Sequence, residues 1–142
     1  MTEKSASVLW SGAGKKGLGK ISTESGALMD YPYGFASRFG DDRRGTNPEE
    51  ILGAAHAACF TMALSLALNE AGFTAESLET SAKISLEKLD TGFSVTASAL
   101  TLTAKVPGID DATFQKVAAG AKANCPISKL LKADISLDAK LS

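Results

Sequence analysis

Hydrophobic residues are densest between Asn47 and Gly72, and this pattern predicts one long helix. Asn47 suits an N-cap and Pro48 the first helical position, where a missing N–H costs nothing. Gly72 can end the helix in the left-handed conformation. The apolar residues form two stripes at helical spacing: Ile51, Ala55, Ala58, Cys59, Met62 and Leu66 on one, and Leu52, Phe60, Leu64 and Leu68 on the other. A helix that is apolar around most of its circumference is normally buried.

Alternating residues before this helix predict strands. Near the N-terminus Ala6, Val8 and Trp10 alternate with Ser5, Ser7 and Leu9, which predicts an edge strand. Further on, the aromatic residues at positions 31, 33, 35 and 39 share one parity, which predicts a strand ending at Arg38-Phe39. By that parity Arg38 faces away from the aromatic residues. Arg38 therefore points outward, unless the strand bends at Gly34 or the side of the strand that carries Arg38 is the one that faces the helix.

The pattern after Gly72 predicts a hairpin, two helices and a closing strand. Two alternating segments meet at the turn 90–92, and the second changes phase, so we expect a β-bulge near Ala99. Asp110 can cap a helix whose apolar side is formed by Phe114, Val117, Ala118 and Ala121. Pro126 begins a short helix, and Ile135, Leu137, Ala139 and Leu141 form the inward face of a last strand.

These elements predict an α+β fold with mainly antiparallel sheet. No linker, repeat or low-complexity segment divides the 142 residues, so the interpretation is a single domain over 1–142. Six short strands from one chain cover one side of the central helix well and the rest poorly. We therefore expect a homodimer with isologous symmetry, in which two such helices pack together.

A glycine-rich stretch, 12–19, contains two nominal nucleotide-binding motifs. Residues 12–17 fit G-x-G-x-x-G, and residues 14–20 fit all but the last position of a P-loop. Both motifs require a helix directly after the glycines, so that its N-terminus can hold phosphate. The residues from Ile21 to Gly26 predict strand and turn instead, which favours a hairpin loop.

Composition narrows the functional classes. The net charge of -1 supplies no basic field for nucleic acid. We expect no membrane span, because His56 interrupts the apolar run before the roughly 20 residues that a span needs, and no secretory signal at the N-terminus. The chain is therefore expected in the cytoplasm, where its two cysteines form no structural disulfide framework.

The candidate chemistry centres on Cys59, Cys125 and the single histidine, His56. Cys59 lies too far along the helix for the dipole to lower its pKa, so by itself it is either an inert core thiol or needs a neighbouring cation. Cys125 sits at the N-cap of a short helix, which favours the thiolate. His56, three residues before Cys59, is either a partner in a Cys–His pair or a hydrogen-bonded core histidine. Two cysteines and one histidine without C-x-x-C spacing are a poor zinc ligand set.

The segment from Asn47 to Phe60, with the sequence NPEEILGAAHAACF, resembles very closely the helix motif of the OsmC/Ohr family, and of its OsmC branch. Pro32-Tyr33-Gly34-Phe35, Arg38-Phe39 and Cys125-Pro126 match as well, and the similarity spans essentially the whole chain. The resemblance implies an intertwined homodimer with antiparallel sheets wrapped around central helices. It also implies a cysteine-based peroxidase that reduces organic hydroperoxides to alcohols without metal, haem or other cofactor.

The resemblance further assigns roles to four residues. Cys59 matches the attacking cysteine and Cys125 the resolving cysteine, which would form a disulfide reopened by a dithiol such as a lipoyl-bearing protein. Arg38 matches the arginine that holds the thiolate, and Glu49 the carboxylate that orients this arginine. The alternative is a non-catalytic protein of the same fold that binds apolar ligands or senses oxidation.

Glu49 and Cys59 are separated by about 15 Å of helix rise. We therefore predict a site shared across the dimer, with Arg38 and Glu49 supplied partly in trans. Arg43 and Arg44 are alternative cations on the adjacent loop, although a surface role suits them better.

Overall fold

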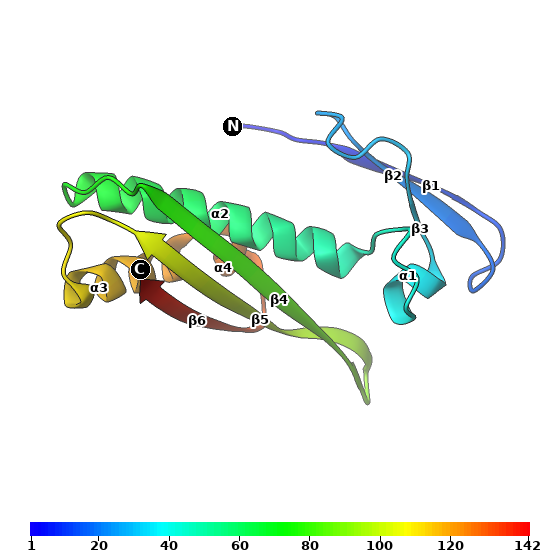
Figure 1. Ribbon diagram of the computed structural model, residues 1–142. Helices are drawn as coiled ribbons and strands as arrows, with labels where there is room; N and C mark the ends of the chain where they lie inside the picture. Colours follow the sequence, from blue (N-terminus) through cyan, green and yellow to red (C-terminus); the bar gives the residue numbers. More distant parts are fainter. The chain divides into compact units, whose positions relative to one another are not determined.

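The computed structural model describes all residues from 1 to 142, and they form two compact units, Met1–Ile51 and Leu52–Ser142. The long helix α2 (Pro48–Glu70) begins in the first unit and continues into the second (Figure 1). The α+β class is confirmed, with three strands in each of two small sheets. The interpretation of residues 1–142 as a single domain stays a prediction.

The first unit contains an antiparallel sheet of β1 (Ala6–Ser11), β2 (Leu18–Thr23) and β3 (Tyr31–Tyr33). The order β1-β2-β3 places β1 at an edge, as predicted. The glycine-rich stretch is the hairpin loop between β1 and β2, and no helix follows it, so neither nucleotide motif has its required context. Gly19 of β2 lies directly beneath the ring of Tyr33, where a side chain would have no room.

The predicted strand from 31 to 39 is wrong in its second half. β3 ends at Tyr33, and residues 35–39 form the short helix α1 (Phe35–Phe39). The Ser37 hydroxyl stabilises this turn, because it accepts a hydrogen bond from the Gly34 N–H at 3.0 Å. Residues four apart share a face in a strand and also in a helix, so the parity of Phe35 and Phe39 could not distinguish the two. Their ring centroids are 5.0 Å apart on one side of α1, and the question of which strand face carries Arg38 disappears.

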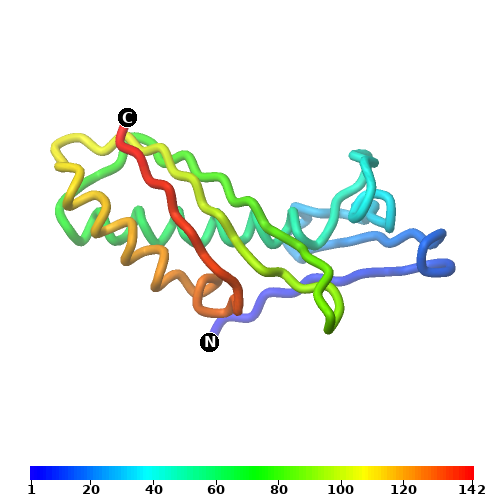
Figure 2. Tube along the Cα trace, turned by 90° about the horizontal axis from the view of Figure 1, so that it is seen from below, coloured from blue at the N-terminus to red at the C-terminus, as the bar shows by residue number.

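The second unit packs helices on one face of a sheet with the order β4-β5-β6. Its remaining elements are β4 (Ser77–Leu89), β5 (Gly92–Lys105), α3 (Asp111–Asn124), α4 (Pro126–Leu130) and β6 (Asp134–Leu141). β4 and β5 form the predicted antiparallel hairpin, whereas β6 pairs with β5 in parallel after the helical crossover. Figures 1 and 2 show α2 and α3 crossing the same face of this sheet.

The predicted bulge exists but lies three residues earlier than expected. Ser85 pairs with Ala97 and Leu86 with Val95, so Thr96 is the extra residue on β5. Beyond it, residues 98, 100, 102 and 104 all face the core. Small alanines at 97 and 99 carry little information on which face is buried, and the hydrophobic pattern therefore located the phase change too late.

Both ends of α2 are fixed as the sequence predicts. The Asn47 side chain accepts a hydrogen bond from the Glu50 N–H at 2.8 Å, satisfying a free donor of the first turn. At the other end Gly72 has φ +91°, and the Phe73 N–H donates to the Leu68 carbonyl at 2.8 Å. With the bond from the Gly72 N–H to the Asn69 carbonyl at 3.0 Å, it forms a Schellman motif, which needs a residue that tolerates positive φ.

The two predicted stripes of α2 have different surroundings. Phe60, Leu64 and Leu68 are fully buried against β5 and α3 in the main core. In the other stripe, Met62 is 69% and Leu66 59% exposed. The second unit by itself therefore covers one side of α2 and leaves an apolar side open.

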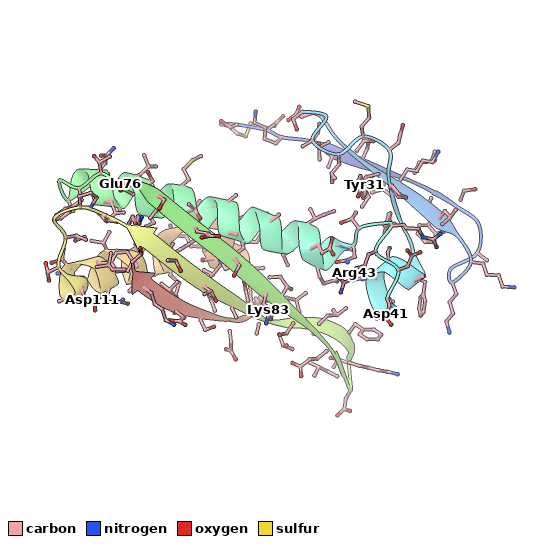
Figure 3. All side chains as sticks on the ribbon, viewed as in Figure 1. Tyr31, Asp41, Arg43, Glu76, Lys83 and Asp111 are labelled. Atoms are coloured by element: carbon pink, nitrogen blue, oxygen red, sulfur yellow. The ribbon has the colours of Figure 1, made fainter.

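By length and composition alone, α2 could cross a membrane, so the interruption of its apolar run at His56 is a weak argument against a span. The packing supplies a better argument, since one side of α2 forms the core of the second unit. Charged residues such as Lys83 of β4 and Asp111 of α3 lie exposed on the surface of this unit (Figure 3).

Candidate functional site

The two cysteines meet in the second unit. Cys59 is half-buried on α2, and Cys125 is fully buried at the N-cap of α4. Both are free thiols; Cys59 packs against the core cluster that contains Cys125, and each thiol shifts the pKa of the other.

The start of α4 positions Cys125. Pro126 opens the helix, as predicted, and the Cys125 sulfur takes the place of a capping oxygen. It accepts hydrogen bonds from the Ser128 backbone N–H at 3.4 Å and from the Ser128 hydroxyl at 3.5 Å. The sulfur thus faces donors rather than hydrocarbon alone.

The surroundings shift the pKa values of the two thiols in opposite directions. Burial raises the pKa of Cys59, and the neighbouring Cys125 raises it further, against a backbone hydrogen bond from Ile127 that lowers it. Burial also acts to raise the pKa of Cys125, but the hydrogen bonds from Ser128, Cys59 and Ile127 outweigh it and lower the pKa. Within the second unit, the surroundings therefore favour the thiolate form more at Cys125 than at Cys59.

His56 is a fully buried, hydrogen-bonded core histidine. Its Nδ1 lies 2.6 Å from the Ser98 hydroxyl and its Nε2 lies 2.8 Å from the Ser128 hydroxyl. Burial lowers the pKa of the imidazole, which favours the neutral ring. Both ring nitrogens are occupied by serines, so His56 forms no nucleophile pair with Cys59; it reaches Cys125 through Ser128 instead.

Arg38 and Glu49 meet in the first unit. The Arg38 Nε lies 3.2 Å from both Glu49 carboxylate oxygens, and its Nη2 lies 2.7 Å from Oε1. The side chain of Glu49 is 14% exposed and that of Arg38 is 36% exposed. The hydrogen bonds to Glu49 raise the pKa of Arg38, and they fix the guanidinium plane while Nη1 stays available.

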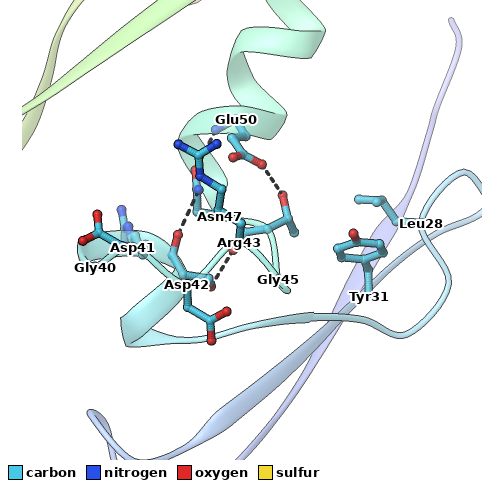
Figure 4. Close-up of a pocket in the computed structure, with 12 residues that line it drawn as sticks. Leu28, Tyr31, Gly40, Asp41, Asp42, Arg43, Gly45, Asn47 and Glu50 are labelled. Atoms are coloured by element: carbon cyan, nitrogen blue, oxygen red, sulfur yellow. Dashed lines mark hydrogen bonds between the residues drawn. The ribbon is translucent and has the colours of Figure 1, made fainter.

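The first unit also contains an open pocket of about 660 Å³, which Arg38 helps to line (Figure 4). Tyr31, Thr46, Asn47 and Glu50 contribute to its walls, and the Thr46 hydroxyl donates to Glu50 at 3.1 Å. Arg38 is therefore accessible from this pocket.

The alternative cations, Arg43 and Arg44, both lie at the surface. Arg44 is 90% exposed and bonds to Asp42 in the same loop, and Arg43 is exposed. No group of three or more His, Cys, Asp or Glu residues is arranged to hold a metal ion.

The predicted site residues thus form two pairs, Cys59 with Cys125 and Arg38 with Glu49. Ser98 and Ser128 were missed by the sequence analysis. Ser98 gives a weak signal, because a polar residue occupies a core-facing position of an otherwise apolar strand segment. Ser128 lies one turn after Cys125, where an N3 side chain can contact the cap.

Comparison with known proteins matches the architecture to one family. The model of the OsmC-like protein family matches residues 40–140. Peroxiredoxin OsmC from Escherichia coli is 56% identical over 132 residues, covering 93% of this chain and 92% of that protein.

Solved structures agree in fold. An OsmC-like protein of unknown function from Vibrio cholerae superimposes with a TM-score of 0.79 at 18% identity, covering 98% of this chain and 99% of the other. The organic hydroperoxide resistance protein OhrB of Bacillus subtilis gives 0.67 at 28% identity, covering 97% and 98%. The chain belongs to the OsmC-like protein family.

Proposed function

We propose that this protein is a cysteine-based peroxidase that reduces organic hydroperoxides to alcohols. The observation that carries the proposal is the proximity of the Cys59 and Cys125 thiols in one core, where each shifts the pKa of the other, since a two-cysteine peroxidase needs its second sulfur near the first. The names of its relatives, a peroxiredoxin and an organic hydroperoxide resistance protein, support the same reaction.

The chemistry proceeds in three steps. The Cys59 thiolate attacks the terminal oxygen of the peroxide, the O–O bond breaks, and the alkoxide leaves and is protonated to the alcohol. Cys59 becomes a sulfenic acid, which condenses with Cys125 to a disulfide and releases water. A dithiol then reduces the disulfide by exchange through a mixed disulfide. We propose a lipoyl-bearing protein as this reductant.

The first step requires a cation, because burial favours the protonated Cys59 thiol. Arg38 is the proposed cation, and the bidentate hold of Glu49 would aim its free Nη1 at the thiolate and the peroxide oxygens. Glu49 and Cys59 are about 15 Å apart along α2 at 1.5 Å per residue. We therefore propose that the arginine and its carboxylate act on Cys59 of the partner subunit.

A homodimer would also cover the open side of α2. The exposed stripe of Ala55, Ala58, Met62 and Leu66 is self-complementary under two-fold symmetry, and a second copy of this chain is its proposed occupant. Light scattering at micromolar concentration should give a dimeric mass, and Met62→Lys should lower it. A monomeric mass for the unchanged chain would refute this assembly.

The trans arrangement has its own test. Cys59→Ser and Arg38→Ala chains should each be inactive, and a mixed dimer should regain part of the activity because one of its two sites is intact. Mass spectrometry of differently tagged chains would establish that subunits have exchanged. No recovery in mixed dimers would rule out a site built from both chains.

We propose alkyl and fatty-acid hydroperoxides as the substrates, because the apolar side chain of Phe35, on the same short helix as Arg38, is exposed for contact with a hydrocarbon tail. A cytoplasmic location would keep the two thiols reduced between turnovers. The central test is peroxide consumption coupled to a dithiol. Cys59→Ala should abolish it, while Thr80→Val, a change on β4, should leave it intact.

One observation favours a second function, a non-catalytic redox sensor or apolar-ligand protein. The raised pKa of Cys59 describes an inert thiol unless a cation acts on it. A sensor would form the disulfide once per oxidant and show no sustained turnover with dithiol present. Multiple turnovers per chain would exclude this function.

A further inference from the structure

A buried chain of hydrogen bonds connects three parts of the second unit to the Cys125 sulfur. It runs from Ser98 of β5 through His56 of α2 to Ser128 of α4, over distances of 2.6 and 2.8 Å, and reaches the sulfur at 3.5 Å. His56, Ser98 and Ser128 are each at most 8% exposed. We call these three residues the imidazole relay.

The hydrogens of the relay can be assigned from its ends. Ser128 donates its hydroxyl hydrogen to Cys125, so its oxygen must accept from the imidazole, which places the ring hydrogen on Nε2. Nδ1 then accepts from the Ser98 hydroxyl. In the reverse orientation the Ser98 hydroxyl hydrogen would need another acceptor, whereas the imidazole is the hydrogen-bond partner of this side chain. All three donors therefore point toward the Cys125 sulfur.

We propose that His56 and Ser128 are positioning residues that hold Cys125 as a thiolate for its attack on the Cys59 sulfenic acid. A row of aligned donors stabilises negative charge at its end, and in a water-poor interior this stabilisation is stronger than in solvent. The ionisable side chain that acts directly on the Cys125 sulfur is that of Cys59. Since Cys59 is the residue being oxidised, it cannot supply this charge control itself.

The step, which rests on the proposed peroxidase function, balances without another oxidant. The Cys125 thiolate donates an electron pair to the Cys59 sulfur, an S–S bond forms, and the S–O bond of the sulfenic acid breaks. Hydroxide leaves with the S–O pair and takes a proton to become water. Cys125 is oxidised and the Cys59 sulfur is reduced. The neutral imidazole keeps its own proton throughout and orients the Ser128 hydroxyl.

The first experiment titrates Cys125 alone, through the ultraviolet absorbance of its thiolate in a Cys59→Ser background. At a pH below the titration midpoint, Ser128→Ala should contain about tenfold less Cys125 thiolate than the Cys59→Ser background. This decrease corresponds to the loss of one hydrogen bond to a charged group. Ser128→Thr keeps the hydroxyl and should preserve the midpoint. Thr80→Val removes a half-buried hydroxyl from β4 and is the matched control.

The second experiment separates the reaction steps in a single turnover with Cys59 present. Ser128→Ala should form the sulfenic acid at the unchanged rate and should form the disulfide about tenfold more slowly at a pH below the midpoint. A purely structural role would slow both steps or neither. Ser98→Ala tests the far end of the relay without touching either sulfur, and it should slow the same single step by about two- to threefold.

The outcomes distinguish this inference from the proposed function. An unchanged Cys125 midpoint in folded Ser128→Ala overturns the relay. If that variant does not fold, an unchanged midpoint in Ser98→Ala overturns it. Failure of the unchanged protein to consume peroxide overturns the peroxidase, yet the titration still decides whether the relay holds the Cys125 charge.

Discussion

Arg38→Lys tests the proposed cation while preserving its charge. The arginine makes three hydrogen bonds to Glu49, from Nε to both carboxylate oxygens and from Nη2 to one of them. Lysine cannot reproduce this fork, because its ammonium group is a point charge on a flexible stem. The substitution therefore keeps the charge and removes the fixed orientation.

Arg38→Lys should cost little in the free energy of unfolding but much in catalytic efficiency. The pair is partly exposed, so its contribution to the free energy of unfolding is below about 1 kcal/mol. If the guanidinium holds the thiolate and the peroxide, loss of one charge-assisted hydrogen bond in the reacting complex costs about 1.5–3 kcal/mol. This cost corresponds to a fall in kcat/KM of about ten- to a hundredfold.

Arg44→Lys is a control of matched geometry in the same unit. Arg44 holds Asp42 through Nε at 2.9 Å and Nη2 at 3.0 Å, and these bonds lower the pKa of Asp42 to about 2. The assay measures kcat/KM for an alkyl hydroperoxide with saturating dithiol, together with the midpoint of thermal unfolding. Arg44→Lys should leave kcat/KM unchanged. Equal activity of Arg38→Lys and the unchanged protein would refute the orienting role.

Three further predictions concern α2 and its histidine. Gly53→Ala should raise stability by up to about 1 kcal/mol by thermal melting, because a methyl group meets Ile84 and Ala82 at ordinary contact distance; a lower melting temperature would contradict this packing. Asn47→Ala should cost about 1 kcal/mol or more through the lost cap, and Asn47→Asp should recover only the capping part, because it cannot donate to the Ser37 carbonyl as the Asn47 amide does; equal losses would contradict the capping bond. Burial lowers the pKa of His56 in the folded protein, so as the pH falls this imidazole is protonated in the unfolded chain before it is protonated in the folded one. The free energy of unfolding should therefore decrease as the pH falls below about 6.5, while the NMR signal of the single histidine in the folded protein stays that of a neutral imidazole. A signal that titrates at the ordinary pKa would contradict this burial effect.

Much of the fold follows from local sequence signals. The cap at Asn47, the glycine at 72 and the turn at 90–92 each specify a backbone geometry from a few adjacent residues, and all three are confirmed. The segment from 31 to 39 was misassigned because the spacing of its phenylalanines fits both a strand and a helix. The bulge was displaced because alanine does not report which face is buried.

The site divides in the same way. The sequence by itself determined that an N-terminal cap and a proline would place Cys125 at the start of a short helix, and that one helix would carry Glu49, His56 and Cys59. The tertiary structure decided what these groups contact: the two sulfurs meet, and the serines that hold the imidazole come from positions 42 and 72 residues away along the chain. Local geometry is set by backbone dihedrals and near neighbours, which a sequence displays. Contacts between distant segments depend on how the sheet and helices close around the core, and no spacing along the chain encodes them.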